Sequence, residues 1–289
     1  MEHALTVDVE DAINQAMRNF FGKEMEPTER VIDNTRRLLD LFAEFDTKAT
    51  FFILGEVAET HPELIRDIAS RGHELGIHGY SHTRYTKLSR IALKEEITRA
   101  KKLVEDISGV EVLGHRAPEF SINQSNLWAL DILISAGIRY DSSIFPASSG
   151  RYGWKGFNKE IDFLDLESGE RIIEAPMSSI RLMGKDIPAC GGGYLRAFPY
   201  SYTGQAFKVI SRNRPVNLYL HPYEIDTPPF QQFYMDELSK SDLKSRLKLR
   251  GYWFNRKTVM PKLRRLLASY QFSTLGNVIN TRLDGHLYK

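Results

Sequence analysis

Hydrophobic runs typical of buried strands alternate with segments of helical periodicity along most of the chain. The first run, His3–Val9, precedes a helical pattern over Glu29–Phe45, in which apolar residues return to one face. Further strands are predicted over Ala49–Leu54, His73–His78, Glu111–Arg116, Ile138–Tyr140, Ile172–Ala175 and Val216–His221, and further helices over Pro62–Ser70, Ser89–Ile107 and Gln124–Ser135. Strands separated by helices in this way predict a parallel sheet or barrel.

Residues 146–200 break this rhythm and contain many glycine, proline and aromatic residues. We interpret them as an insertion or an irregular wall, and not as a separate domain. Within them, the CGGGYLRAFPY segment (190–200) lacks the Gly-Lys-Ser/Thr ending of a phosphate loop. It indicates a flexible wall beside a binding cleft or an ordinary loop.

Composition narrows the class of protein. The formal net charge of +2 is too small to suggest a nucleic-acid partner, and no apolar stretch approaches the roughly 20 residues that cross a bilayer. The first residues carry no basic segment followed by an apolar run, so no secretory signal is predicted. The single cysteine, Cys190, cannot form an internal disulfide. We therefore expect a cytoplasmic protein.

Residues 240–265 depart from this even balance, because lysine and arginine greatly outnumber a single acid, Asp242. Such a segment is typical of the solvated face of one or two helices. It would also suit a surface that contacts anionic lipid headgroups or phosphates. The sequence therefore leaves a peripheral membrane contact open.

Polar side chains gather at the predicted carboxyl ends of the strands, where the active groups of a barrel lie. His78 ends one strand, and His82 follows it across a short turn, so the two imidazoles can converge. The other polar residues at strand ends are Asp8, Glu10, Asp11, Arg116, Asp141 and His221. Two imidazoles and a carboxylate form a site for a divalent cation that leaves room for water and substrate.

These groups suit the hydrolysis of an amide or ester. A bound cation lowers the pKa of its water and polarises a carbonyl oxygen. A second carboxylate could take the proton, and a more distant histidine could protonate the leaving group. Each group taken alone also fits an ordinary role, such as a surface histidine pair, a helix N-cap or a salt bridge. Their joint occurrence on successive strand ends favours catalysis.

In this order, the motifs TVDVED, HGYSH, RAPEF and LYLHP resemble the signature of the polysaccharide deacetylase family (NodB homology, carbohydrate esterase family 4). The resemblance implies an irregular (β/α)7-type barrel within residues 1–225, and the removal of acetyl groups from sugars with zinc, cobalt or nickel. Residues 226–289 further resemble the C-terminal extension of deacetylases linked to exopolysaccharide and O-antigen synthesis. We expect them to form a helical extension packed on the barrel.

The resemblance also implies a role for individual residues: Asp8 as the base, His78 and His82 as metal ligands, Arg116 as the residue that orients the base, His221 as the general acid, and the backbone N–H near Glu119 as an oxyanion donor. The chain departs from the family at the metal carboxylate, because Val9 stands where the aspartate is expected. Glu10 or Asp11 would then be the ligand. Asp8 and Glu10 share a face of a regular strand, but the strand is expected to end here, so both residues stay candidates.

Other departures concern the substrate pocket and the acid. Glu119 replaces a tyrosine whose main chain does the oxyanion work, and Tyr219 stands where an acetyl-pocket leucine is usual. Together with Asp141, they are our candidate substrate contacts. The family's Asp-x-x-Asp-Trp motif has no clear match, so the acidic partner of His221 is not identified.

The resemblance implies a metal-dependent carbohydrate N-deacetylase of bacterial surface-polysaccharide biosynthesis. The expected partner is an N-acetylated sugar, either nucleotide- or lipid-linked or an oligosaccharide, and no nucleic acid. Two alternatives stay open: a related carbon–nitrogen hydrolase acting on a small amide or ureide, and an inactive barrel that binds glycan.

Overall fold

The computed structural model describes residues 1–147, 153–227, 240, 242–243, 251 and 253–288. Its centre is a curled sheet with the strand order β10-β1-β2-β3-β4-β5-β7-β6, in which β11 also pairs with β1. The strands are β1 (His3–Val9), β2 (Thr50–Ile53), β3 (Glu74–Ile77), β4 (Gly114–His115), β5 (Tyr140–Asp141), β6 (Asp162–Asp165), β7 (Arg171–Glu174), β10 (Asn217–Leu220) and β11 (Phe272–Ser273). A separate hairpin joins β8 (Ser179–Leu182) and β9 (Lys185–Pro188).

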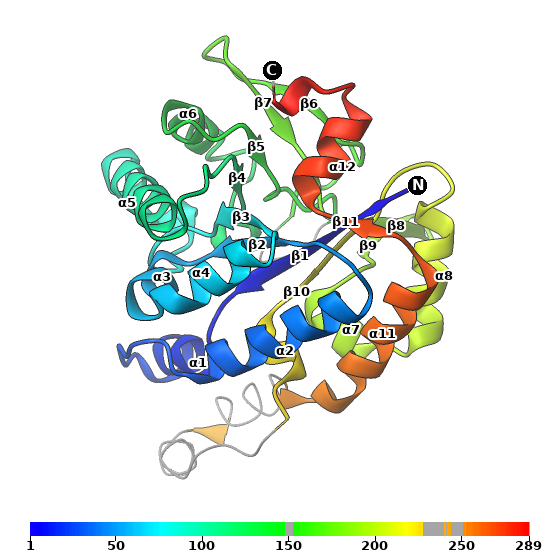
Figure 1. Ribbon diagram of the computed structural model, residues 1–289. Coiled ribbons are helices and arrows are strands. Elements are labelled where there is room, and N and C mark those ends of the chain that lie inside the picture. Colours follow the sequence, from blue (N-terminus) through cyan, green and yellow to red (C-terminus); the bar gives the residue numbers. More distant parts are fainter. Residues whose placement is uncertain (148–152, 228–239, 241, 244–250, 252, 289) are drawn as a thin grey trace.

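Helices cover the outside of the sheet (Figure 1). They are α1 (Ala12–Phe21), α2 (Arg30–Glu44), α3 (Gly55–Thr60), α4 (Pro62–Ser70), α5 (Arg90–Ser108), α6 (Trp128–Ser135), α7 (Gly192–Ala197), α8 (Tyr200–Ile210), α11 (Val259–Ser269) and α12 (Leu275–Arg282). Along the sheet, β10, β1, β2, β3, β4, β5 and β7 are parallel, and β6 alone is antiparallel. The predicted irregular α/β barrel is therefore confirmed.

The first strand is an interior strand of this sheet. All of β1 is buried, and it pairs with β2 on one side and β10 on the other. A strand buried on both faces is typical of a parallel sheet covered by helices. Beyond β10, Gly191 forms an isolated bridge with Tyr219, and a Cβ on Gly191 would lie 2.1 Å from the Tyr219 carbonyl oxygen. Glycine is required there for the wall of the barrel to close on β10.

The predicted elements differ from the structure mainly at their ends. The Glu111–Arg116 strand is reduced to the two residues of β4, and the Gln124–Ser135 helix begins only at Trp128. The pattern did not reveal α1 or the β8–β9 hairpin. The irregular stretch 146–200 contains β6, β7, β8, β9 and α7. These elements are too short to produce a clear hydrophobic period in the sequence.

Segments from the end of the chain return to its beginning. β11 pairs with the start of β1, and the N-terminus of α12 is held by Thr50 and Glu74. The Leu275 N–H donates to Thr50 Oγ1 over 2.7 Å, and the Gly276 N–H donates to Glu74 Oε2 over 3.0 Å. The division of the chain at residue 225 stays a prediction, which no observation tests.

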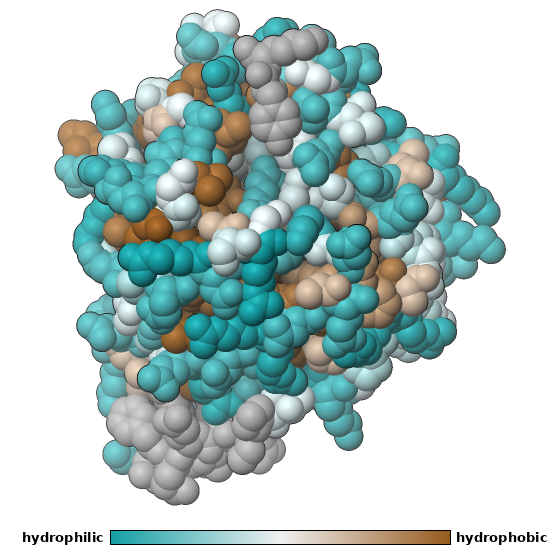
Figure 2. Space-filling view, viewed as in Figure 1, coloured by the Kyte–Doolittle hydropathy of each residue, from teal (hydrophilic) through white to brown (hydrophobic). Residues whose placement is uncertain are grey.

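Residues 240–265 belong only partly to the described structure, because residues 241, 244–250 and 252 lie outside it. Several described cations of this segment make contacts within the chain. Lys262 Nζ donates to the carbonyl oxygens of Leu195 and Phe198, and Arg264 pairs with Glu44. In the part of the chain that the structure describes, no helix combines the length and apolar character needed to cross a bilayer. On the face shown in Figure 2, hydrophobic residues lie in small groups among hydrophilic ones.

Two buried histidines at the amino ends of β1 and β3 accept hydrogen bonds from backbone N–H groups. His73 Nδ1 accepts from Ala49 N over 3.1 Å, and His3 Nδ1 accepts from Val216 N over 3.1 Å. Protonation of either ring would put a hydrogen on Nδ1, which could then no longer accept the hydrogen bond from the backbone N–H. Burial and the nearby cations Lys48 and Arg71 lower the pKa of His73 to about 4, from 6.5. Burial and the N-terminal amine lower that of His3 to about 4.

Acid should therefore destabilise the fold through His73. Its folded-state pKa lies below the unfolded value, so the unfolded chain binds more protons and stability falls as the pH drops from 6.5 towards 4. Asparagine can accept the same hydrogen bond without titrating. We expect His73→Asn to reduce the loss of unfolding free energy between pH 7 and pH 5.5 by about 1 kcal/mol in urea titrations. His286→Asn, at an exposed position, is the control and should lose as much unfolding free energy between pH 7 and pH 5.5 as the native protein. The same loss in His73→Asn as in the native protein would contradict the prediction.

Candidate active site

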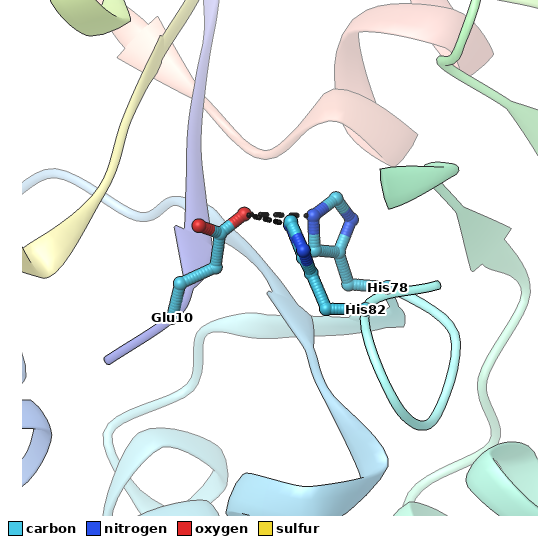
Figure 3. Close-up of side chains that lie close together, drawn as sticks. All are labelled: Glu10, His78 and His82. Carbon is cyan, nitrogen blue, oxygen red and sulfur yellow. Dashed lines mark hydrogen bonds and ion pairs between the residues drawn. The ribbon is translucent and has the colours of Figure 1, made fainter. Parts of the chain in front are cut away.

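Three predicted metal ligands meet at the carboxyl ends of β1 and β3 (Figure 3). Glu10 follows the last residue of β1, and His78 follows the last residue of β3. Glu10 Oε1 lies 3.0 Å from His78 Nε2 and 3.0 Å from His82 Nε2. The three ligand atoms lie within 4.8 Å of one another. One small cation can therefore contact all three residues.

The hydrogen bonding of His78 tests whether a metal fits this site. Its Nδ1 lies 2.8 Å from the Arg116 carbonyl oxygen, which can only accept, so Nδ1 carries the hydrogen. In a neutral ring, Nε2 then presents a lone pair to the Glu10 carboxylate. Two lone pairs 3.0 Å apart repel unless a proton or a cation lies between them. A metal that binds both atoms removes this repulsion, and the second bond of His78 is one that metal-bound histidines commonly make.

The charge on Glu10 suits the same role. The side chain is buried, which would raise its pKa, but the neighbouring His82 and His221 hold that pKa well below its ordinary value. A lowered pKa favours the ionised carboxylate, which is the form that can bind a cation.

Asp11, the alternative ligand, does not face the two histidines. Its Oδ1 accepts hydrogen bonds from Ile13 N (2.6 Å) and Asn14 N (3.3 Å), and its Oδ2 accepts from Thr28. It is the N-cap of α1, a role that satisfies N–H groups left unpaired at the start of a helix. The structure therefore corrects the sequence-based pair of candidates, and only Glu10 faces the histidines.

A buried ion pair lies beside this group. Arg116 follows β4 and is fully buried, and its Nη1 lies 2.6 Å from Asp8 Oδ1. Arg116 also donates to Thr6 Oγ1, the Ser142 carbonyl oxygen and Ser142 Oγ. The guanidinium is thus fixed by several partners and holds the Asp8 carboxylate in one orientation.

His221, at the end of β10, completes the cluster. Its Nε2 lies 3.7 Å from Glu10 Oε1, and its Nδ1 lies 3.3 Å from Glu224 Oε1. Glu224 is buried and lies 3.4 Å from Arg196 Nη1. Burial opposes a charge on His221, but Glu10, Glu224 and Asp8 outweigh it and raise the pKa of the imidazole.

Glu224 is the acidic partner that the motif comparison did not identify. It stands three residues after His221, within a 3₁₀ helix (Pro222–Ile225) that brings the two side chains together. Burial would raise the pKa of Glu224, but His221 and Arg196 lower it. The signal was present in LYLHPYE, since positions three apart meet on one turn of such a helix.

Glu119 and Tyr219, two of the candidate substrate contacts, lie in a strained turn and in a buried strand. Glu119 and Phe120 have φ values of 52° and 51°, so the turn after Arg116 contains two successive left-handed residues that are not glycine. Such backbone strain is concentrated at functional sites. Tyr219 is almost fully buried in β10, and its ring centroid lies 5.1 Å from that of Phe120 and 5.7 Å from that of His221.

Asp141 is not placed to contact a substrate, which corrects the prediction made for it. It ends β5 but is fully buried, with His115 Nδ1 at 2.6 Å from its Oδ1 and Ser143 Oγ at 2.7 Å from the same atom. The Ser143 N–H also bonds to Oδ2, so the loop after β5 folds over the carboxylate. Its hydrogen bonds hold this loop, and Ser143 Oγ in turn accepts from the Ala117 N–H beside Arg116.

Comparison with known proteins gives two matches along the chain. Residues 27–140 match the sequence profile of a family described as polysaccharide deacetylase. Residues 142–280 match a domain of unknown function, DUF3473. His78, His82 and Arg116 lie in the first match and His221 lies in the second, whereas Asp8 and Glu10 precede both.

Two curated relatives are similar to part of the chain. A peptidoglycan-N-acetylglucosamine deacetylase of Bacillus cereus is 32% identical over 101 residues, which are 35% of this chain and 37% of that protein. A peptidoglycan deacetylase of Helicobacter pylori is 31% identical over 137 residues, 47% of this chain and 42% of that protein. The chain thus spans less than half the length of these relatives.

A solved structure matches almost the whole chain. The crystal structure of a Mycobacterium smegmatis protein, named as a candidate polysaccharide deacetylase, has a TM-score of 0.63 and 20% identity. The match covers 97% of this chain and 90% of that one. At this level of identity, the similarity demonstrates a shared fold.

The buried Arg116–Asp8 pair should dominate the stability of this end of the barrel. Arg116→Met leaves the Asp8 carboxylate buried without its cation, and we expect the unfolding free energy in urea to fall by about 3–5 kcal/mol. The double variant Asp8→Asn/Arg116→Met should recover part of this loss, because the isolated charge is gone. Arg36→Met is the control, because it removes the half-exposed ion pair between Arg36 and Asp67. It should lower the unfolding free energy by less than about 1 kcal/mol. Equal losses in the two single variants would contradict the prediction.

Proposed function

We propose that this chain is a metal-dependent carbohydrate N-deacetylase, because its residues 27–140 match the polysaccharide deacetylase family. The observation that carries the proposal is the convergence of Glu10, His78 and His82 beside Asp8 and His221. Ligands for a cation, a carboxylate and a second histidine are the groups that amide hydrolysis requires.

The ligand set suits zinc, with cobalt or nickel as alternatives, since it combines two imidazoles with one carboxylate. When bound by Glu10, His78 and His82, a divalent cation would polarise the acetamide carbonyl and make a nearby water more acidic. The residues of the chain supply the proton transfers and the orientation.

Asp8 is the proposed base. It accepts a proton from the attacking water as the water oxygen bonds to the acetamide carbonyl carbon. Arg116 keeps the carboxylate in place through the 2.6 Å contact and restricts its rotation. The backbone N–H near Glu119, in the left-handed turn after Arg116, is the proposed donor to the developing oxyanion.

His221 is the proposed general acid. It gives its proton to the sugar nitrogen as the carbon–nitrogen bond breaks, which leaves an amine on the sugar and releases acetate. Glu224 accepts a hydrogen bond from Nδ1 and stabilises the protonated ring, and Arg196 holds Glu224. The contact between His221 Nδ1 and the buried Glu224 carboxylate favours the protonated ring, which supports His221 as the acid.

The substrate proposed is an N-acetylated sugar of bacterial surface-polysaccharide synthesis, such as that of O-antigen. Two relatives, a peptidoglycan-N-acetylglucosamine deacetylase and a peptidoglycan deacetylase, support an N-acetylhexosamine. A nucleotide- or lipid-linked form of the sugar, a cytoplasmic location and a peripheral membrane contact through residues 240–265 stay predictions that no observation tests.

Acetate release is the direct test of this function. We expect the zinc-loaded protein to release acetate from N-acetylglucosamine oligosaccharides and a chelator to stop the reaction. Asp8→Asn should lower kcat by at least about 100-fold, as loss of a general base does. Asp106→Asn, at an exposed position in α5, is the matched control and should retain full activity.

The two alternatives give different results in the same assay. Turnover of ureides or formamides in the absence of acetate release would indicate the related carbon–nitrogen hydrolase. Binding of the oligosaccharide without any turnover would indicate an inactive glycan-binding barrel.

Glu224 should matter for the acid step. Glu224→Ala removes the charge that stabilises protonated His221, so we expect kcat to fall by about 10- to 100-fold with KM little changed. Glu224→Gln keeps a hydrogen-bond acceptor but loses the charge, so its kcat should lie between that of Glu224→Ala and that of the native protein. Glu63→Ala, at an exposed site on α4, is the control. A fall in kcat with Glu63→Ala equal to that with Glu224→Ala would argue against a specific role.

A further inference from the structure

The turn that joins the two metal-binding histidines has no regular secondary structure. Residues 79–81 connect His78, at the end of β3, to His82, which has a φ of 57°. A non-glycine residue in the left-handed region costs free energy, so neighbouring contacts must hold it there. The position of His82 relative to His78 therefore depends on what holds this turn.

Backbone N–H groups of α3 hold two carbonyl groups of the turn. The Gly55 N–H donates to the Gly79 carbonyl oxygen over 3.0 Å, and the Glu56 N–H donates to the Tyr80 carbonyl oxygen over 3.1 Å. These donors lie in the first turn of the helix, where N–H groups have no partner within the helix. Gly55 also leaves room for the Tyr80 ring, since a Cβ there would lie 2.1 Å from Tyr80 Cδ2.

A single carboxylate holds the N–H side of the turn. Glu96 Oε2 accepts from Tyr80 N over 2.9 Å and from Ser81 N over 3.0 Å, and Glu96 Oε1 accepts from Ser81 Oγ over 2.5 Å. Glu96 belongs to α5, which packs on α3. Hydrogen bonds to an ionised carboxylate are stronger than those between neutral groups.

The carbonyl next to His82 is held by an arginine. Arg18 Nη1 donates to the Ser81 carbonyl oxygen over 2.5 Å. The same guanidinium bonds to both carboxylate oxygens of Glu56, at 2.9 and 3.0 Å, and Arg18 Nε bonds to Glu24. Arg18 lies on α1, the helix that begins directly after Glu10 and Asp11.

We propose that Glu96 and Arg18 are positioning residues of the metal centre. Neither reaches the ligand atoms, but together they fix both sides of the peptide chain between His78 and His82. This holds His82 Nε2 at the Glu10 carboxylate before any cation binds, so that binding does not have to order the turn. The proposal rests on the proposed metal site and adds that its affinity is set partly from α1 and α5.

Metal affinity tests the proposal without an activity assay. Glu96→Ala should weaken Zn²⁺ binding by about 10- to 100-fold in competition with a chromogenic chelator, as loss of residues that orient ligands does. The visible absorption of the Co²⁺ form should change as well, because His82 is no longer held in one place. Glu96→Gln can still accept at one oxygen and donate to Ser81 Oγ, so it should restore most of the affinity.

Glu95→Ala is the matched control, one residue away on the exposed face of α5, and it should bind Zn²⁺ like the native protein. Arg18→Met is a second, independent variant and should weaken binding in the same direction. Thermal unfolding of each metal-free variant reports whether it folds. Glu96→Ala and Arg18→Met proteins that fold and bind Zn²⁺ with native affinity would overturn the positioning role. A native protein that takes up neither Zn²⁺ nor Co²⁺ would instead overturn the metal site itself.

Discussion

Arg116 connects the two halves of the candidate site. Its guanidinium is buried without any exposure and holds Asp8, whereas its backbone carbonyl accepts a hydrogen bond from His78 Nδ1. A buried arginine is tolerable only if its charge is paired and its N–H groups are bonded, and here Thr6 and Ser142 complete the set. One residue thereby fixes both the orientation of the proposed base and the tautomer of a proposed metal ligand.

The geometry of β1 explains how the chain tolerates Val9 at the position of the expected aspartate. Val9 is fully buried in the main hydrophobic core, so it faces the helices that cover the sheet. Side chains alternate along a strand, which places Glu10 on the same side as Asp8. Glutamate is one methylene longer than aspartate, and its carboxylate reaches the two imidazoles from one residue further along. The function of the missing aspartate is therefore available to Glu10.

The sequence predicted the parts of the site that depend on strand ends, because parallel strands bring their carboxyl ends together. His78, His82, Arg116 and His221 follow from that rule. The sequence could not distinguish Glu10 from Asp11, because a residue between a strand and a helix can act either as a ligand or as an N-cap. Tertiary contacts decide between the two roles. Asp141 obeys the same rule but is covered by its own following loop, which strand periodicity does not reveal.

The candidate site also shows how the two matched segments depend on each other. His221 and Glu224 lie in the DUF3473 match, and His78 and Arg116 lie in the deacetylase match. The strand that carries Asp8 lies between β2 of one segment and β10 of the other, and β11 pairs with its start. Residues 27–140 alone would lack Asp8, Glu10 and His221, and their sheet would lose β1 and β10. The second segment is therefore part of the same barrel, because it supplies strands of the sheet and the proposed acid.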